Sequence, residues 1–187
     1  MSRPRSCRTS SPASNCARSS AASEGRLQQI FAPWRFAYVS HADSAGACVL
    51  CDAAHGGVET LTLAVDGRAF ALLNRYPYTS GHSMVAPVAH LGDFSELDPA
   101  TLADLMRLAQ RVVRAIGTTY HPHGFNVGFN LGEAAGAGIA DHLHLHIVPR
   151  WRGDTSFLTV NADVRVIPED LGETCAKLRQ ALEVPGA

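Results

Sequence analysis

Apolar and polar residues alternate strictly from His142 to Ile147, and every polar position in this stretch is a histidine. Period-two alternation is typical of a half-buried β-strand. On such a strand His142, His144 and His146 project from one face, while the leucines between them enter the core. Neighbouring histidines then lie about 6.6 Å apart at their Cα atoms, from the rise of a strand. The pattern therefore predicts a row of three imidazoles on one surface of a sheet.

The apolar pattern predicts further strands before this row. Two apolar runs, at residues 60–65 and 69–74, flank the turn dipeptide Asp66-Gly67 and predict a hairpin. Further strands are expected at 82–87 and 125–131. The small residues that follow, up to position 138, predict a loop that leads into the histidine strand.

Helical spacing of apolar residues follows Asp98-Pro99. Aspartate is a good N-cap and proline suits the first helical position, so a long helix begins there. Gly117 predicts the end of this helix. A second helix is expected at 171–182, and a turn-rich knuckle at 48–57. Together the patterns predict an α+β fold, an antiparallel sheet with a long helix and a C-terminal helix.

Composition limits the classes of partner. The chain has 187 residues, 46% of them apolar, which suits one domain with a sizeable core and tails. A net charge of −1 gives no basis for nucleic-acid or membrane binding through bulk electrostatics. No apolar run approaches the roughly 18 residues of a membrane span. We therefore expect neither nucleic acid nor membrane as a partner.

Residues 1–25 differ from the rest, with four arginines, eight serines and Glu24 as the one acidic residue before Asp43. Such a segment cannot bury enough apolar surface to order itself. We expect a disordered extension at 1–25, the main domain at 26–170, and a C-terminal helix and tail at 171–187. An Arg- and Ser-rich start also suits a transit peptide, but no periodicity indicates a targeting helix. A cytoplasmic protein is expected.

Five cysteines, an odd number, argue against a disulfide framework. Cys48 and Cys51 form a Cys-x-x-Cys pair, which in a reducing compartment indicates metal binding or redox chemistry. A four-coordinate zinc site needs two more ligands, and His90 and His142 are the candidates. The alternative is a metal-free protein in which both thiols are simply reduced.

The small-residue loop and the histidine row together favour phosphate chemistry. Small residues let backbone amides approach an anion closely, so Gly136, Ala137 and Gly138 are candidate phosphate-binding residues. His144 has an imidazole on each side, which favours it as the nucleophile. Its second ring nitrogen is expected to donate to a backbone carbonyl. The alternatives are a surface strand that happens to carry histidines, and a metal or phosphate grip without turnover.

The stretch from His142 to Val148 resembles the motif of the histidine triad (HIT) family, His-φ-His-φ-His-φ-φ, in which φ is apolar. The similarity extends over about residues 30–170. Segments 121–130 and 149–154 look most like the bacterial diadenosine-tetraphosphate phosphorylase and hydrolase branch. The resemblance implies a HIT-like fold with a five-stranded antiparallel sheet, a homodimer, and no organic cofactor.

The resemblance also implies roles for the histidines. His144 is the nucleophile and forms a nucleotidyl-histidine intermediate. His146 contacts the phosphoryl oxygens or the bridging oxygen, and His142 supports them. Some triad proteins hold zinc with a Cys-x-x-Cys pair and two histidines, which here correspond to the following set: Cys48, Cys51, His90 and His142.

Three more residues match nucleotide-contacting positions of the family. Asn74 corresponds to the residue that contacts the ribose, and its other interpretation is a turn residue after a strand. His82 corresponds to a second histidine near the phosphates, and a surface position is the alternative. Asn130 precedes the small-residue loop. Where the family often has Gln followed by Ser or Thr, this chain has Ala137-Gly138, so only backbone amides can serve there.

The implied activity is cleavage of a dinucleoside polyphosphate, such as diadenosine tetraphosphate, at the α-phosphate, with phosphate or water as acceptor. A nucleoside phosphoramidase of the same fold is the near alternative. A nucleotide- or zinc-binding module without turnover is a second alternative, and a zinc-stabilised structural protein is a third. The last would leave the pattern of Asn74, His82 and the small-residue loop unexplained.

Overall fold

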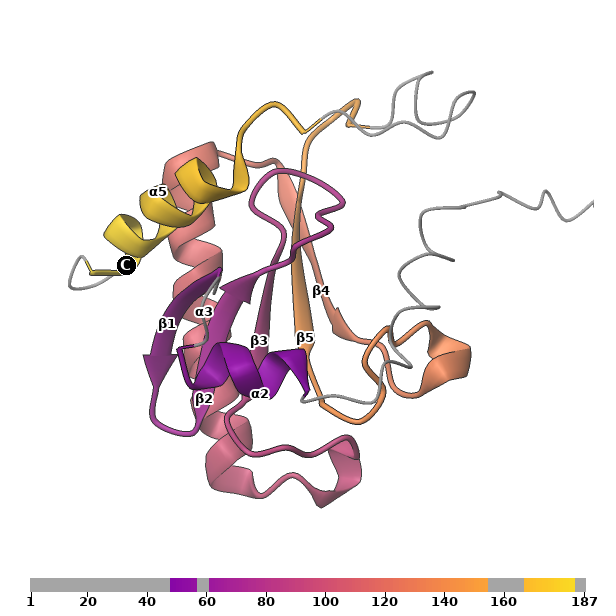
Figure 1. The fold of residues 1–187 in the computed structure, drawn as a ribbon. Coiled ribbons are helices and arrows are strands. Elements are labelled where there is room, and N and C mark those ends of the chain that lie inside the picture. The colour runs from indigo at the N-terminus through magenta and orange to yellow at the C-terminus, as the bar shows by residue number, and fades with distance from the viewer. Residues whose placement is uncertain (1–47, 57–60, 155–166, 184–187) are drawn as a thin grey trace, which may run out of the picture. The chain divides into compact units, whose positions relative to one another are not determined.

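The computed structural model describes residues 48–56, 61–154 and 167–183 (Figure 1). The extension expected at 1–25, and the domain boundary expected after it, lie outside these ranges and stay predictions. None of the helices within the described ranges combines the length and the hydropathy that a membrane span requires.

Five strands form one antiparallel sheet, as the apolar pattern predicts. In their order across the sheet they are β1 (Thr62–Asp66), β2 (Ala69–Leu73), β3 (Ser83–Pro87), β5 (Leu145–Arg150) and β4 (Gly124–Phe129). The predicted hairpin consists of β1 and β2, and Gly67 in its turn has a φ of 59°. Glycine adopts this left-handed conformation without strain. β5 therefore lies between β3 and the edge strand β4.

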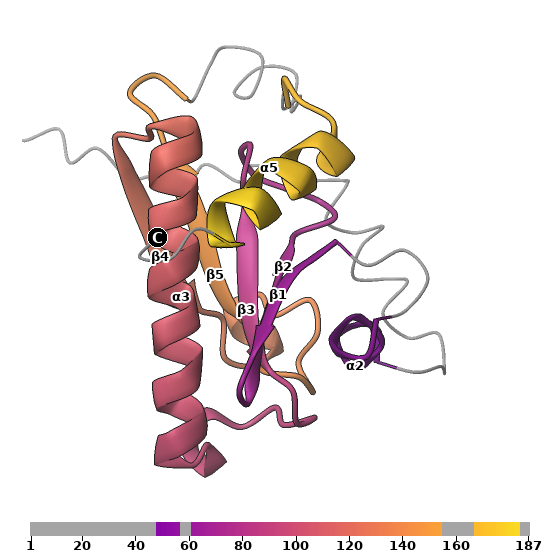
Figure 2. The ribbon, with the colours of Figure 1, turned by 90° about the vertical axis from the view of Figure 1, so that its left-hand side faces the viewer.

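Helices lie on both faces of the sheet (Figure 2). α3 (Pro99–Tyr120) and α5 (Leu171–Glu183) pack on one face, and the short α2 (Val49–Ala54) lies on the other. Two 3-10 turns, η1 (Phe94–Glu96) and η2 (Glu133–Ala135), lie in loops. Leu145 and Ile147 of β5 belong to the core under α3, so His146 between them points to the opposite face. We call that opposite face the triad face.

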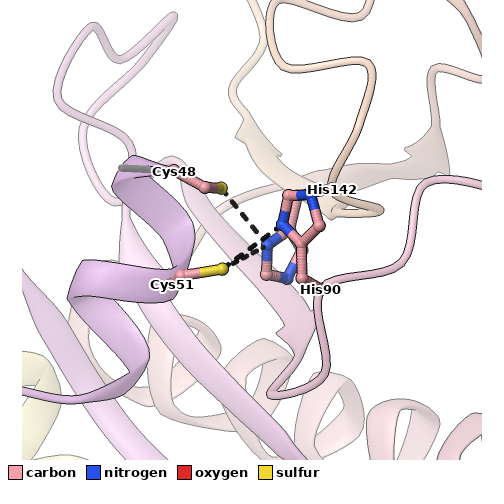
Figure 3. Close-up of side chains that lie close together, drawn as sticks. All are labelled: Cys48, Cys51, His90 and His142. Atoms are coloured by element: carbon pink, nitrogen blue, oxygen red, sulfur yellow. Dashed lines mark hydrogen bonds between the residues drawn. The ribbon is translucent and has the colours of Figure 1, made fainter. Parts of the chain in front are cut away.

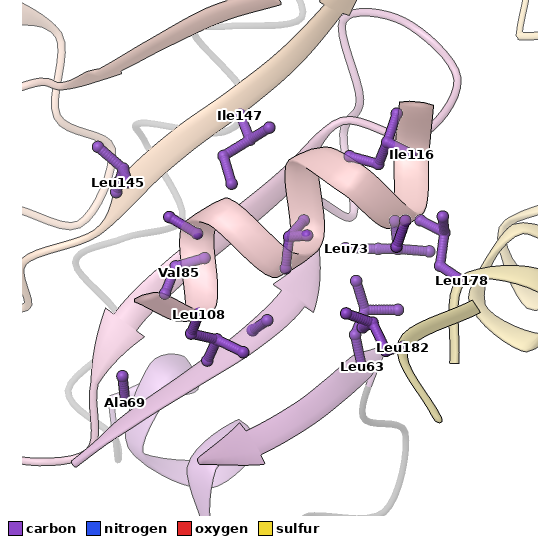
Figure 4. Packing of buried hydrophobic residues seen from close by; sticks show 14 of the residues in the cluster. Leu63, Ala69, Leu73, Val85, Leu108, Ile116, Leu145, Ile147, Leu178 and Leu182 are labelled. Atoms are coloured by element: carbon purple, nitrogen blue, oxygen red, sulfur yellow. The ribbon is translucent and has the colours of Figure 1, made fainter. Parts of the chain in front are cut away.

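Two apolar clusters hold these layers together. The larger lies between the sheet, α3 and α5, and its fully buried members include Val85, Leu108, Ile116, Ile147 and Leu178 (Figure 4). Burying each such side chain stabilises the fold by about 1.5–3 kcal/mol. Because α5 contributes to this cluster, the C-terminal helix belongs to the same core as the sheet. The smaller cluster attaches α2 to the triad face, and its members are Leu50, Ala53, Phe70, Leu72, Met84 and Ala86.

The long helix begins where the sequence predicts and ends later. The carboxylate of Asp98 accepts hydrogen bonds of 3.0 Å from the N–H groups of Ala100 and Thr101. Gly117 does not end the helix, which continues to Tyr120 and stops at His121, whose φ is 47°. A glycine inside a helix costs about 1 kcal/mol. Packing of the following turn, where Tyr120 lies against the core, outweighs that cost.

Three local expectations are corrected. The knuckle expected at 48–57 contains a helix, α2, because Leu50 and Ala53 bury one helical face against the sheet. The strand expected at 125–131 is Gly124–Phe129. The histidine strand begins at Leu145 instead of His142. β3 ends at Pro87, which has no N–H to extend the ladder toward residue 143.

The carboxylate of Glu169 joins α3 to α5. It accepts hydrogen bonds from the hydroxyls of Tyr120 and Thr174 and pairs with the ammonium of Lys177. These bonds, led by the one from Lys177, hold the pKa of Glu169 at about 2. Burial, together with the bond to Glu169, raises the pKa of Tyr120 to about 12.

Replacing Glu169 by Gln should lower the free energy of unfolding by about 1–2 kcal/mol at neutral pH, because a partly buried carboxylate with three partners is lost. The pKa of Glu169 is depressed in the folded state, so its contribution is complete above about pH 4.5 and is lost as the pH falls toward 2. Urea unfolding should therefore show a wild-type advantage that shrinks from about pH 6 to about pH 3. Glu173→Gln, an exposed change on α5, is the control. A pH-independent difference would contradict this assignment.

Candidate active site and metal centre

The three histidines of the alternating motif lie in and just before β5, and they have different surroundings. His146 is half-buried within the strand, and His144, 4% exposed, precedes it. Their ring centroids are 4.9 Å apart. His142 is fully buried and contacts Cys48 and Cys51 instead. The three imidazoles of the expected row therefore differ in their contacts. The rings of His144 and His146 lie beside each other, and the ring of His142 lies beside the thiols at α2, which packs on the same triad face.

Four potential metal ligands converge at this third ring (Figure 3). The Sγ of Cys48 lies 3.4 Å from the Nδ1 of His142. The Sγ of Cys51 lies 3.3 Å from the Nδ1 of His90 and 3.5 Å from that of His142. All four ligand atoms lie within 4.8 Å of one another. We call these four residues the metal cluster. The structure thus brings together the set that the sequence singled out.

The donor chemistry of the metal cluster fits a tetrahedral ion. Bonds of about 2.3 Å to sulfur and about 2.0–2.1 Å to nitrogen place the two donors about 3.6 Å apart in a tetrahedron. The Nε2 of His142 donates to the carbonyl of Pro87 at 2.8 Å, so its Nδ1 presents a lone pair to the sulfurs. Burial and the neighbouring Cys48 thiol raise the pKa of Cys51. A cation is therefore needed here to hold both sulfurs in the thiolate form that binds a metal.

The metal cluster is assembled by a close approach between two loops. His90 lies in the loop after β3, and His142 lies in the loop before β5. The N–H of Leu143 donates to the carbonyl of Leu91 at 2.7 Å. A Cβ on Gly92 would lie 2.8 Å from the carbonyl oxygen of Ala140, closer than side chains tolerate. Glycine at position 92 is thus required for the two ligand-bearing loops to pack together.

His144 has one ring nitrogen fixed by the backbone. Its Nδ1 lies 2.8 Å from the carbonyl oxygen of His142, which can only accept, so Nδ1 carries the proton. Its Nε2 therefore holds a lone pair, and no side chain of the described ranges bonds to it. Burial lowers the pKa of His144, which keeps the ring neutral at pH 7. This is the arrangement of a nucleophilic imidazole.

His146 is oriented by a chain of hydrogen bonds from the backbone. The N–H of Tyr78 donates to the Nδ1 of His82 at 3.1 Å, so neutral His82 carries its proton on Nε2. That Nε2 lies 3.0 Å from the Nδ1 of His146 and donates to it. His146 then carries its own proton on Nε2. His82 is fully buried and the Tyr78 ring stacks on it at 4.6 Å, so the surface alternative for His82 is wrong.

Asn74 lies at the end of β2, next to this chain of hydrogen bonds. Its Oδ1 accepts from the N–H of Tyr76 at 2.9 Å, and its Nδ2 lies 3.5 Å from the Nε2 of His82. The side-chain oxygen of Asn74 therefore stabilises the turn after β2, as the alternative interpretation expected. Its NH₂ group is still able to donate to a hydroxyl. Contact with a ribose stays a prediction.

Some backbone N–H groups of the small-residue loop donate to carbonyls within the loop itself. The N–H of Gly136 donates to the carbonyl of Glu133 at 2.8 Å, and that of Ala137 donates to the carbonyl of Gly132 at 3.2 Å. Of the three amides expected to meet phosphate, only that of Gly138 donates to no backbone carbonyl within the described ranges. Asn130 is half-buried and follows β4 at the start of this loop. The phosphate role of these residues stays a prediction.

Two groups that matter in the site escaped the sequence analysis. The carbonyl of Pro87 and the N–H of Tyr78 set the proton positions of His142 and His82. Backbone groups are common to all residues, so no residue type could have pointed to them. His55 lies outside the metal cluster and contacts the carbonyl of Cys51, and the Nδ1 of His123 accepts from the N–H of Arg152.

The chain is similar in sequence to known proteins. A family model described as HIT domain matches residues 57–153. AP-4-A phosphorylase of Mycobacterium tuberculosis is 44% identical over 116 residues, which cover 62% of this chain and 60% of that protein. The chain thus spans about three fifths of the length of this relative. An adenosine 5'-monophosphoramidase of Schizosaccharomyces pombe is 33% identical over 103 residues, covering 55% of this chain and 74% of that protein.

A solved structure shares the fold. It is described as a Zn-bound histidine triad family protein from Mycobacterium smegmatis. It superposes with a TM-score of 0.61 at 34% sequence identity, covering 73% of this chain and 93% of that one.

Proposed function

The chain belongs to the HIT domain family, and from this premise we propose that it is an enzyme that transfers a nucleotidyl group from a dinucleoside polyphosphate to phosphate or water. Diadenosine tetraphosphate is the leading substrate. The relative named AP-4-A phosphorylase supports this choice, as do the segments around Asn130 and Arg150 that resemble its branch. The proposed reaction begins with attack at the α-phosphate and proceeds through a nucleotidyl-histidine intermediate.

The observation that carries the proposal is the single available nitrogen of His144. Its Nδ1–H is held by the carbonyl of His142, and its Nε2 has a lone pair in a neutral, buried ring. In the proposed step Nε2 bonds to the α-phosphorus, and the bond from phosphorus to the bridging oxygen breaks. The acceptor then attacks the same phosphorus and releases His144 unchanged.

His146 is suited to the departing oxygen. The hydrogen bonds from Tyr78 through His82 leave its proton on Nε2, and its ring lies 4.9 Å from that of His144. An N–H donor at this place stabilises the charge that develops on the bridging oxygen. Asn74 and the amide of Gly138 are proposed to hold the ribose and a phosphate oxygen. His82 is proposed to position His146.

The metal cluster is proposed to hold zinc and to position the nucleophile. Its two sulfur and two imidazole donors suit this ion, and the Zn-bound relative supports the choice. Bound zinc supplies structural stability at such a closed site. His142 links it to the reaction, since its ring belongs to the cluster and its carbonyl orients His144. His142 is thus proposed to act as a ligand and a positioning residue instead of touching phosphate.

A nucleoside phosphoramidase is the second candidate, because a relative carries that activity in its name. It would use the same attack by His144 and differ only in the group that leaves. The third candidate is a module that binds nucleotide without turnover. Binding alone does not require a neutral imidazole with an available lone pair, such as that of His144. We also propose a homodimer, for which the exposed edge strand β4 offers a surface. Reduced thiols at Cys48 and Cys51 suit the cytoplasmic location that we expect.

Product analysis tests the activity. Purified protein is incubated with diadenosine tetraphosphate, with and without inorganic phosphate, and the nucleotides are separated by chromatography. ADP with ATP, dependent on phosphate, identifies a phosphorylase, whereas AMP with ATP identifies a hydrolase. Turnover of adenosine 5'-phosphoramidate alone would favour the second candidate, and no turnover of either would favour the binding module.

His144→Ala should abolish turnover and leave nucleotide binding largely intact. The attacking atom is lost, and the expected fall in rate is on the order of a million-fold, as when a protease loses its nucleophile. Affinity is spread over Asn74, Gly138 and His146, so titration calorimetry should still detect binding. In the wild type, mass spectrometry after an acid-free quench should find a nucleotidyl group on His144. His123→Ala removes a histidine outside the site and serves as control. Near-normal rates in His144→Ala would refute the nucleophilic mechanism.

Metal analysis should find about one zinc per chain. Cys48→Ser should lose it and unfold at lower temperature, because the binding free energy of a structural site is folding free energy. His55→Gln, which changes an exposed histidine outside the cluster, should keep the metal. Purified protein without metal, and with a melting temperature indifferent to Cys48→Ser, would show that the metal-free alternative is right.

A further inference from the structure

The two sides of His146 on the triad face are unequal. Across the ladder His146 pairs with Met84 on β3 and with Gly128 on β4. Directly paired residues project from the same face of a sheet. Met84 is 7% exposed and belongs to the smaller cluster under α2. Gly128 is exposed and has no side chain. One side of His146 is therefore filled, and the other is bare backbone.

No contact within the described ranges requires glycine at position 128. A Cβ built there meets no atom of the described residues within 4 Å. Its φ is not in the left-handed region, since Gly128 is absent from the positive-φ glycines of the described chain. Glycine inside a strand is less stable than alanine. The strand thus keeps a bare position beside His146, although no contact and no φ angle of the described residues requires it.

A cation lies further along the same face. Asn126 pairs with Val148, two residues beyond His146, and its Oδ1 accepts from the Nη1 of Arg150 at 2.8 Å. From the strand rise, this contact is about 7 Å beyond His146. The Nε and Nη2 of Arg150 donate to the carboxylate of Asp154 at 2.6 and 2.9 Å. A guanidinium has five N–H donors, so two remain after these three bonds.

The nucleoside and the leaving group occupy opposite sides of His146. Asn74, the proposed ribose contact, lies at the end of β2, on the filled side. The leaving group must then depart on the other side, over Gly128. A polyphosphate placed there runs over bare strand toward Arg150, and a planar guanidinium with two remaining donors matches phosphate oxygens. The ion pair with Asp154 holds the guanidinium in place and offsets part of its charge.

We infer that Gly128 is a specificity-determining position, which leaves room beside His146 for a polyphosphate leaving group whose outer phosphates meet Arg150. This inference rests on the proposed function and deepens it. It assigns the site to substrates whose leaving group is a chain of phosphates carrying a second nucleoside. A small leaving group, such as the ammonia of a phosphoramidate, does not extend over the surface between Gly128 and Arg150.

Gly128→Val tests the inference, because a β-branched side chain suits a strand and fills the bare position. The kcat/KM for diadenosine tetraphosphate should fall about tenfold or more, and that for adenosine 5'-phosphoramidate should stay within about twofold. Gly128→Ala should lie between wild type and Gly128→Val. Val127→Leu is the matched control, since Val127 is an exposed neighbour that points to the α3 face. It should leave both substrates unchanged.

Arg150→Gln gives a second, independent measurement. It should raise the KM for diadenosine tetraphosphate several-fold and leave the KM for the phosphoramidate unchanged. Arg152→Gln removes an exposed cation two residues along the chain and is its control. Melting temperatures of all variants identify any that fail to fold. If Arg150→Gln unfolds, the Gly128 series still decides the inference.

The possible results distinguish a failure of the inference about Gly128 from a failure of the proposed function. Equal kcat/KM for diadenosine tetraphosphate in wild type and Gly128→Val would overturn the inference and leave the proposed function standing. An equal loss for both substrates would also overturn it, because position 128 would then act on the catalytic histidines themselves. A wild-type protein that does not cleave diadenosine tetraphosphate would refute the proposed function, and the inference with it.

Discussion

The geometry of the site depends on His142, a fully buried histidine. Both of its ring nitrogens and its carbonyl oxygen have partners. Its Nε2 donates to Pro87, its Nδ1 faces the thiols, and its carbonyl accepts from His144. A buried polar group that loses its partner costs about 1–3 kcal/mol. Within the described ranges no buried side-chain nitrogen or oxygen is left unpaired. Rotating this ring would break contacts on both sides, so the proposed nucleophile beside it is held equally firmly.

Backbone groups set the proton positions of the histidines to which we assign catalytic roles. A carbonyl can only accept and an amide can only donate, so each contact determines one tautomer. Two carbonyls act on His142 and His144, and one amide acts on His82 and, through it, on His146. The result is one imidazole with an available lone pair beside another with an outward proton. Attack at phosphorus and departure of an oxygen need these two complementary groups.

The apolar pattern predicted the strands, the start of α3 and the chemistry-bearing residues well, because those features are local. The Cys-x-x-Cys spacing and the family resemblance singled out four further positions, which the structure brings together: Cys48, Cys51, His90 and His142. The departure of His142 from the sheet was not predictable from its own segment. It follows from Pro87, which lies far away in the chain and lacks the N–H that the ladder needs. The late end of α3 likewise depends on tertiary packing of Tyr120, which outweighs the preference of Gly117.

The role that we infer for Gly128 depends on the order of the strands. β5 has the inner strand β3 on one side and the edge strand β4 on the other. Side chains on the inner strand must pack, and α2 covers them, so the surface on that side is fixed. An edge strand carries no such demand on its exposed face, where a residue can be bare or bulky at little cost to the core. We therefore expect that variation at Gly128 changes which group leaves without moving His144 or His146.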